Sequence, residues 1–182
     1  MILDKFKEFP KSRISYILAV VGFLIVLLVE IFVFLPIEST VSTSGYGIID
    51  YEFAWSASQV LSIFSAWGPS GLTNQINAIY WDFLFIIGYV TLAFSLISLV
   101  FQRSNETIQT IGKYIPITPF LTGIFDIIEN VYLLMMATNP SSIIDTNAIL
   151  ASLSASLKFG LLIVGIIYFI VALIHVLYKK LK

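Results

Sequence analysis

The chain has 182 residues, of which 58% are hydrophobic and 12% are charged, and its formal net charge is -1. A soluble domain is about 45–50% apolar and about 25% charged, so lipid must be the main solvent of this chain. Absence of cysteine and the presence of one histidine exclude disulfides, iron–sulfur clusters, cysteine-based zinc sites and bis-histidine haem. We expect no cofactor, and the near-balanced charge gives no argument for nucleic-acid binding.

Four apolar stretches are long enough to cross about 30 Å of hydrocarbon, which takes about 20 residues of helix. They cover about 14–35, 80–101, 114–136 and 149–178. Pro36 is expected to close the first stretch. That stretch is longer than the apolar core of a cleaved signal peptide, about 7–15 residues, so we interpret it as a retained helix. The pattern predicts an all-α integral membrane four-helix bundle that forms a single domain over 1–182.

The basic residues flank these stretches on one side. Lys5, Lys7, Lys11 and Arg13 precede the first, Arg103 and Lys113 separate the second from the third, and Lys179, Lys180 and Lys182 follow the fourth. The two other connections, about 36–79 and 138–148, contain no Lys or Arg. By the positive-inside rule both termini are cytoplasmic and both of these connections are external. We therefore predict a multi-pass protein of the plasma membrane, N-in and C-in.

The first external connection is long enough to hold a helix of its own. Asp50 as a cap predicts a helix over about 51–67, ended by Gly68 and Pro69. Its apolar residues recur at helical spacing, which makes it amphipathic: Phe53, Val60, Phe64 and Trp67. The residues leave open whether it lies on the outer membrane surface, caps the bundle or is an ordinary packed loop helix. Residues 72–78 are interpreted as a polar extension of the second span.

A few ionisable side chains remain within the spans: Glu30, Asp82, Asp126, Glu129 and Lys158. Asp126, Glu129 and Asn130 have the spacing i, i+3 and i+4, so they share one helix face. A charge that faces lipid costs at least about 2.5–3.5 kcal/mol, so these groups should face the bundle interior, with Lys158 pairing with Asp126 or Glu129. One base cannot neutralise four acids. The remaining acids must be protonated, hydrated from outside or bound to a cation or an amine.

Three short stretches resemble a family of uncharacterised prokaryotic four-span membrane proteins. They are Asp82-Phe83-Leu84-Phe85 with Tyr89, Asp126-Ile127-Ile128-Glu129-Asn130, and Lys158 in the last span. Tyr51-Glu52-Phe53-Ala54 and Ala66-Trp67-Gly68 also look like the external segment of that family. The resemblance covers about 45–170 and implies that the acids and the lysine belong to one site. It implies no activity.

The leading functional prediction is binding of a small lipid-like or cationic ligand between the helices. The candidate binding residues are Asp126, Glu129, Asn130, Lys158, Asp82, Tyr89 and Glu30. Asp126 and Glu129 would contact the ligand head, Asn130 would orient them and Lys158 would be the counter-ion. The expected partners are the bilayer, a small amphiphilic ligand, and other membrane proteins or a second copy of the chain.

Other functions stay open at this point. The polar set is also compatible with purely structural contacts between helices, as in an accessory subunit of a membrane complex. A membrane-embedded acid–base enzyme, a carboxylate site for a hard cation, and proton or cation transport are further alternatives. The sequence contains no Ser-His-Asp arrangement and no nucleotide-binding glycine loop. Because acid–base chemistry by the intramembrane acids needs neither, the sequence does not decide whether the protein is an enzyme.

Overall fold

The computed structural model describes residues 6–181, and over that range the chain is helical without strands. Lys5 and Lys182 lie outside the described residues. Four helical segments are long and apolar enough to cross a membrane: Ser12–Ser44, Ala57–Arg103, Ile115–Thr138 and Asp145–Leu181. Each contains one predicted span. The all-α class and the four long apolar helices are therefore confirmed, and they are compatible with a polytopic membrane protein.

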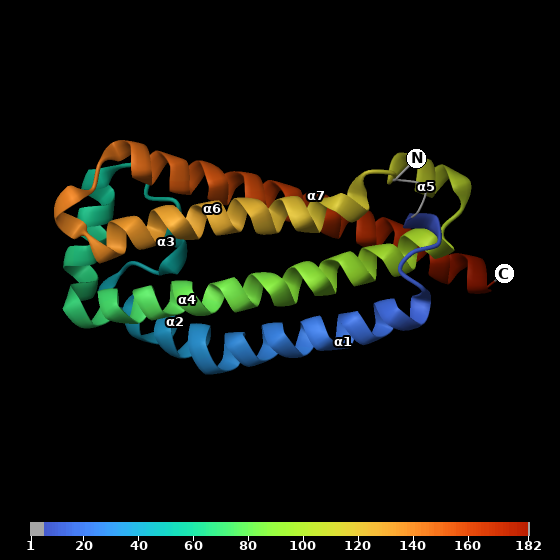
Figure 1. The fold of residues 1–182 in the computed structure, drawn as a ribbon, viewed down its shortest axis with the longest axis horizontal. Coiled ribbons are helices and arrows are strands. Elements are labelled where there is room, and N and C mark those ends of the chain that lie inside the picture. The colour runs from blue at the N-terminus through green and yellow to red at the C-terminus, as the bar shows by residue number, and fades with distance from the viewer. Residues whose placement is uncertain (1–5, 182) are drawn as a thin grey trace.

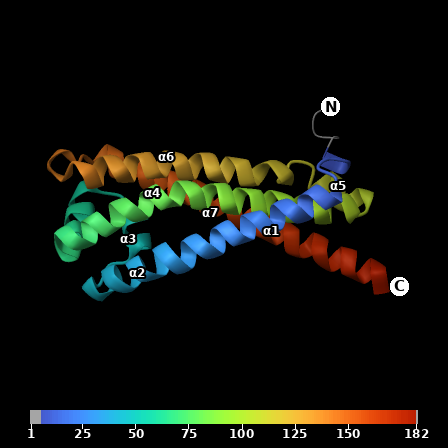
Figure 2. The same ribbon diagram turned by 60° about the horizontal axis from the view of Figure 1, so that its bottom comes forward.

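The elements form an elongated bundle (Figure 1). In chain order they are α1 (Ser12–Val29), the π-helical turn η2 (Glu30–Phe34), α2 (Leu35–Val41), the 3₁₀ turn η3 (Ser42–Ser44), α3 (Ile48–Glu52), α4 (Ala57–Arg103), α5 (Glu106–Ile111), the 3₁₀ turn η4 (Ile115–Ile117), α6 (Thr118–Thr138), the 3₁₀ turn η5 (Pro140–Ser142) and α7 (Asp145–Leu181). Helix α4 packs against α1, α6 and α7, and α6 packs along α7. The start of α1, helix α5 and the end of α7 lie at one end, while α2 and α3 lie toward the other (Figure 1). Figure 2 shows the last turns of α7 leaning away from the bundle.

The helix of the first predicted span continues past Pro36, so this proline does not end the helix. Residues Glu30–Phe34 form a π-helical turn, and Pro36 lies in the first turn of the next helix, α2. In an uninterrupted α-helix the proline ring would clash with the carbonyl group four residues earlier. A π turn has a wider hydrogen-bond spacing, and a proline at the start of a new helical segment needs no N–H group.

The helix predicted over 51–67 is also wrong in its bounds, because the structure divides it into two helices. Helix α3 ends at Glu52, and α4 begins at Ala57. Between them Trp55 has a φ of 58°, in the left-handed region that a right-handed helix cannot contain. The side chain of Ser56 caps α4 instead of Asp50, since its oxygen accepts the third N–H of the new helix.

Helix α4 is broken at Gly68, where the sequence predicted a helix end. This glycine has φ 65° and ψ -178°, a conformation that side chains with a Cβ rarely adopt. The helix resumes immediately at Pro69 and runs to Arg103, so it starts earlier than the predicted second span. Residues 72–78 are its first turns.

Two hydrophobic clusters fill the bundle and leave a polar section between them. The first joins α3, the start of α4, the end of α6 and the start of α7; it includes Tyr51, Val60, Ile63, Phe64, Trp67, Leu133, Met136 and Ala151. The second joins α4 and α7 near the opposite end; it includes Ile97, Phe101, Tyr168 and Ala172. The segment before Gly68 thus packs into the end of the bundle instead of standing apart. Asp82, Tyr89, Asp126 and Lys158 lie between the two clusters along their helices.

Candidate functional site

Lys158 on α7 is the centre of a buried ionic cluster. Its Nζ lies 2.9 Å from Asp126 Oδ1 and 2.8 Å from Glu129 Oε2, both on α6, and 3.5 Å from Glu52 Oε1 at the end of α3. Lys158 is 8% exposed and Glu129 is fully buried. The sequence predicted Asp126 or Glu129 as the partner of Lys158. The structure contains both pairs, because residues three apart on one helix present both carboxylates to the facing helix.

Glu52 reaches this cluster because the connection between α3 and α4 is attached to the rest of the bundle. The Tyr51 hydroxyl donates to the Leu133 carbonyl oxygen of α6 at 2.7 Å. The backbone N–H of Trp55 donates to Ser152 Oγ of α7 at 3.1 Å. The Phe53 ring stacks on the Phe159 ring with centroids 5.8 Å apart. These contacts hold the end of α3 next to Lys158, so the Glu52 carboxyl lies close to its ammonium group.

Two further contacts extend the polar network along α4. The Tyr89 hydroxyl donates to Asp126 Oδ2 at 2.8 Å, so Asp126 is held between Tyr89 and Lys158. Asn130 Nδ2 donates to Asp82 Oδ2 at 2.6 Å. The amide nitrogen of Asn130 thus faces α4, and its role as the group that orients Asp126 and Glu129 stays a prediction. An i+4 spacing defines a helix face but not which neighbouring helix each side chain meets.

A cavity of about 590 Å³ adjoins this network. We call it the polar cavity. Its lining carboxyl groups are those of Glu30, Glu38, Glu52, Asp82 and Asp126, and Lys158, Asn130 and Gln75 also line it. Glu129 is behind the lining, in contact with Lys158. Of the predicted site residues, Glu30 thus borders the cavity from the α1 side without joining the ion pairs given above.

The charges of the site do not balance. Asp82, Asp126, Glu129 and Glu52 face one ammonium group, so full ionisation would leave three negative charges uncompensated in a largely buried region. Such charges are stable only when they are paired, protonated or solvated. Burial raises the pKa of the Glu52 carboxyl above its ordinary value, the Lys158 charge lowers it and the Asp126 charge raises it. The site is therefore able to hold protons or a cationic guest.

The chemistry of the side chains limits what the site can bind. Within residues 6–181 no group of three or more His, Cys, Asp or Glu side chains is arranged to hold a metal ion. Gln75 Oε1 is buried and accepts no hydrogen bond from the described residues. Gln75 is 1% exposed and lines the polar cavity. An unpaired buried acceptor is costly, so this oxygen would be stabilised by a hydrogen-bond donor.

Among the lining residues that sequence reasoning missed are three with polar side chains at one end of the bundle: Glu52, Glu38 and Gln75. They lie in or next to the long connection between the first two predicted spans, where hydropathy does not predict which side chains are buried in the bundle. One signal was available for Glu52, because it lies within the segment Tyr51-Glu52-Phe53-Ala54 that carries part of the family resemblance. Glu38 is fixed by its own contact, since Oε2 accepts the Ile48 N–H at 3.0 Å.

Comparison of the chain with protein-family models, curated proteins and solved structures finds no match.

Proposed function

We propose that the chain is a multi-pass plasma-membrane protein with both termini in the cytoplasm. The basic residues at the start of α1, around α5 and at the end of α7 support this orientation, because these segments share one end of the bundle (Figure 1). The segment from Ala57 to Gly68 would then close the outer end. The ionic cluster would lie in the outer half of the membrane.

We propose that this protein binds a small lipid-like or cationic ligand whose polar head enters the polar cavity. The observation that carries the proposal is the lining of that cavity, with five carboxyl groups and one lysine. Lys158 is already within 2.9 Å of Asp126 and Glu129. Its charge is therefore largely neutralised by its partners, and the lining acids outside the ion pairs, Glu30, Glu38 and Asp82, attract a positive head.

The space beside the polar network supports binding over a purely structural role. A polar network that only joined helices would need no concave space at its side. Here the network borders a volume of about 590 Å³. Concave sites between bundle helices with a few converging polar groups are common ligand sites.

Binding of simple amines to the purified protein tests the proposal. Butylamine, butyrate and butanol have similarly short alkyl tails and differ in head charge. In mild detergent, butylamine should raise the temperature of thermal unfolding in a concentration-dependent way, while butyrate and butanol should not. Asp82→Asn should reduce the effect of butylamine. Glu106→Gln, which removes one carboxylate from α5 at the other end of the bundle, should not.

Two results would contradict the proposal. One is an equal shift with butyrate and butylamine, which would indicate a non-specific effect on the detergent. The other is the absence of a butylamine shift in a protein whose unfolding is cooperative.

A further inference from the structure

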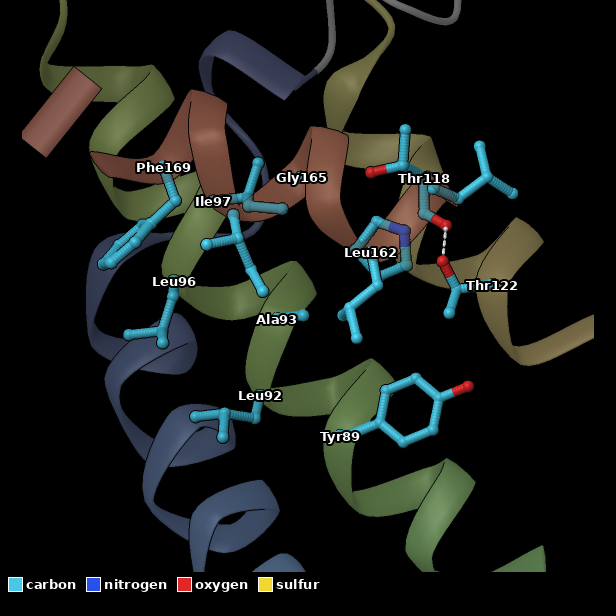
Figure 3. Close-up of a pocket in the computed structure, with 13 residues that line it drawn as sticks. Tyr89, Leu92, Ala93, Leu96, Ile97, Thr118, Thr122, Leu162, Gly165 and Phe169 are labelled. Atoms are coloured by element: carbon cyan, nitrogen blue, oxygen red, sulfur yellow. Dashed lines mark hydrogen bonds between the residues drawn. The ribbon is translucent and has the colours of Figure 1, made fainter. Parts of the chain in front are cut away.

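A second cavity lies beside the polar cavity and has the opposite character. It has a volume of about 200 Å³ and lies among α4, α6 and α7. We call it the apolar cavity. Tyr89 borders one end and Phe169 the other, with Ala93, Leu96 and Gly165 between them (Figure 3).

The apolar cavity offers few polar atoms to a guest. Thr122 lines it, but its hydroxyl donates to the Thr118 carbonyl oxygen at 3.0 Å, a bond that is drawn in Figure 3. The Thr118 hydroxyl donates to the Ile115 carbonyl oxygen at 2.9 Å. The Tyr89 hydroxyl is engaged by Asp126. The cavity therefore presents methyl groups, methylenes and ring faces, and it suits a hydrocarbon chain.

The two cavities share part of their lining. Tyr89, Thr122 and Leu162 border both of them. A guest with its head against Asp82 and Glu52 could thus extend its tail past these three side chains into the apolar cavity. A volume of about 200 Å³ suits one hydrocarbon chain better than the paired chains of a diacyl lipid.

The polar cavity also specifies the head group. Gln75 Oε1 is a buried acceptor without a donor among the described residues, and the surplus charge of the lining is negative. A protonated amine supplies both a positive charge and N–H donors. A quaternary ammonium supplies the charge alone, and an alcohol supplies a donor alone.

We propose that the natural guest is a single-chain amphiphile with a protonated, N–H-bearing amine head, its head in the polar cavity and its tail in the apolar cavity. This inference rests on the proposed function and adds to it the class of ligand and the direction in which the ligand lies. With the orientation proposed above, the tail points from the outer half of the membrane toward the inner half.

A chain-length experiment with a cavity-filling variant tests the position of the tail. Ala93→Phe places a ring in the apolar cavity, and Ile87→Phe adds the same ring to the exposed side of α4 as a control. Butylamine should stabilise the wild type and both variants equally. Octylamine should bind the wild type and Ile87→Phe alike, and it should bind Ala93→Phe about tenfold more weakly, because its added methylenes lose their site.

The outcomes separate the two proposals. If octylamine binds Ala93→Phe as tightly as the wild type, the tail does not occupy the apolar cavity; the inference is overturned and the proposed function stands. If neither amine binds the wild type, both fall. Octyltrimethylammonium should bind roughly tenfold more weakly than octylamine, because it cannot donate to the unpaired Gln75 oxygen. Equal affinity would overturn the assignment of the head group.

A photochemical measurement makes the test independent of any variant. Octylamine that carries a diazirine at the tail end should label side chains of the apolar cavity, such as Leu96 or Phe169, when it is irradiated on the unmodified protein. Excess octylamine should suppress this labelling. Labels confined to the exposed face of α1, such as Leu24, would place the tail in the surrounding detergent or lipid and overturn the inference.

Discussion

Replacing Lys158 with methionine should destabilise the bundle strongly. The substitution keeps an unbranched side chain, shorter by one atom, and removes the only cation within 3.5 Å of Asp126, Glu129 and Glu52 in the described structure. Removing one partner of a buried ion pair costs about 3–5 kcal/mol, because the other charge remains buried and unpaired. With three carboxylates left uncompensated, we expect a loss toward the upper end of that range.

The free energy of unfolding is best measured by titration with a denaturing detergent, followed by tryptophan fluorescence. Trp67 is 7% exposed and lies in the first hydrophobic cluster, so its emission should report loss of packing at that end. Adding Glu129→Gln to Lys158→Met removes one of the uncompensated charges and should restore about 1–3 kcal/mol. Lys179→Met, at the exposed end of α7, is the matched control and should change stability by less than about 0.5 kcal/mol.

The reasoning would be refuted by a loss below about 1 kcal/mol in Lys158→Met, which is typical of an exposed ion pair. It would also be refuted if the effects of Lys158→Met and Glu129→Gln simply added, because residues in one ionic network should show coupling.

Three further predictions concern other contacts of the bundle. Tyr89→Phe removes the donor to Asp126 and should lower the free energy of unfolding by about 1–3 kcal/mol. The denaturing-detergent titration measures this loss, and no change would contradict the hydrogen bond between Tyr89 and Asp126. Burial raises the pKa of Glu52, so its contribution to stability should be complete below its ordinary pKa of 4.5 and should decline as the pH rises through the raised value. Glu52→Gln should remove this decline from a plot of the free energy of unfolding against pH, and an unchanged slope would show that Glu52 is not its cause. A Cβ at Gly22 would lie 2.6 Å from the Gly88 carbonyl oxygen, so Gly22→Ala should push α1 away from α4 at a cost of about 1–3 kcal/mol. A cysteine pair engineered between the two helices should then form its disulfide more slowly, and an unchanged rate would contradict the prediction.

Hydropathy was sufficient to predict the four long helices, because crossing a bilayer requires a run of apolar residues that little else in a chain produces. The shared face of Asp126, Glu129 and Asn130 followed from helical spacing alone. The pairing of Asn130 with Asp82 did not, since it depends on the rotation of α6 relative to α4. That rotation is set by packing over the whole length of both helices.

The long connection between the first two spans was the least predictable part of the chain. The segment is helical on both sides of Trp55, as its sequence pattern predicts, but the left-handed conformation of Trp55 itself is not predictable from the sequence. The turn at Trp55 and its bond to Ser152 place Glu52 in the ionic cluster. The site therefore contains an acid that no pattern within the apolar stretches indicates, and its position depends on contacts between residues about a hundred positions apart.

The side of the polar cavity built by η2 and α2 is continuous with α1, and α1 packs mainly on α4. None of the ion pairs of Lys158 involves that side. A lateral displacement of α1 would therefore widen this side of the cavity while the ionic cluster stayed intact. Entry between α6 and α7 would require the ion pairs of Lys158 to Asp126 and Glu129 to separate first. A guest of the proposed kind should accordingly exchange on the α1 side, while Lys158 keeps its ion pairs.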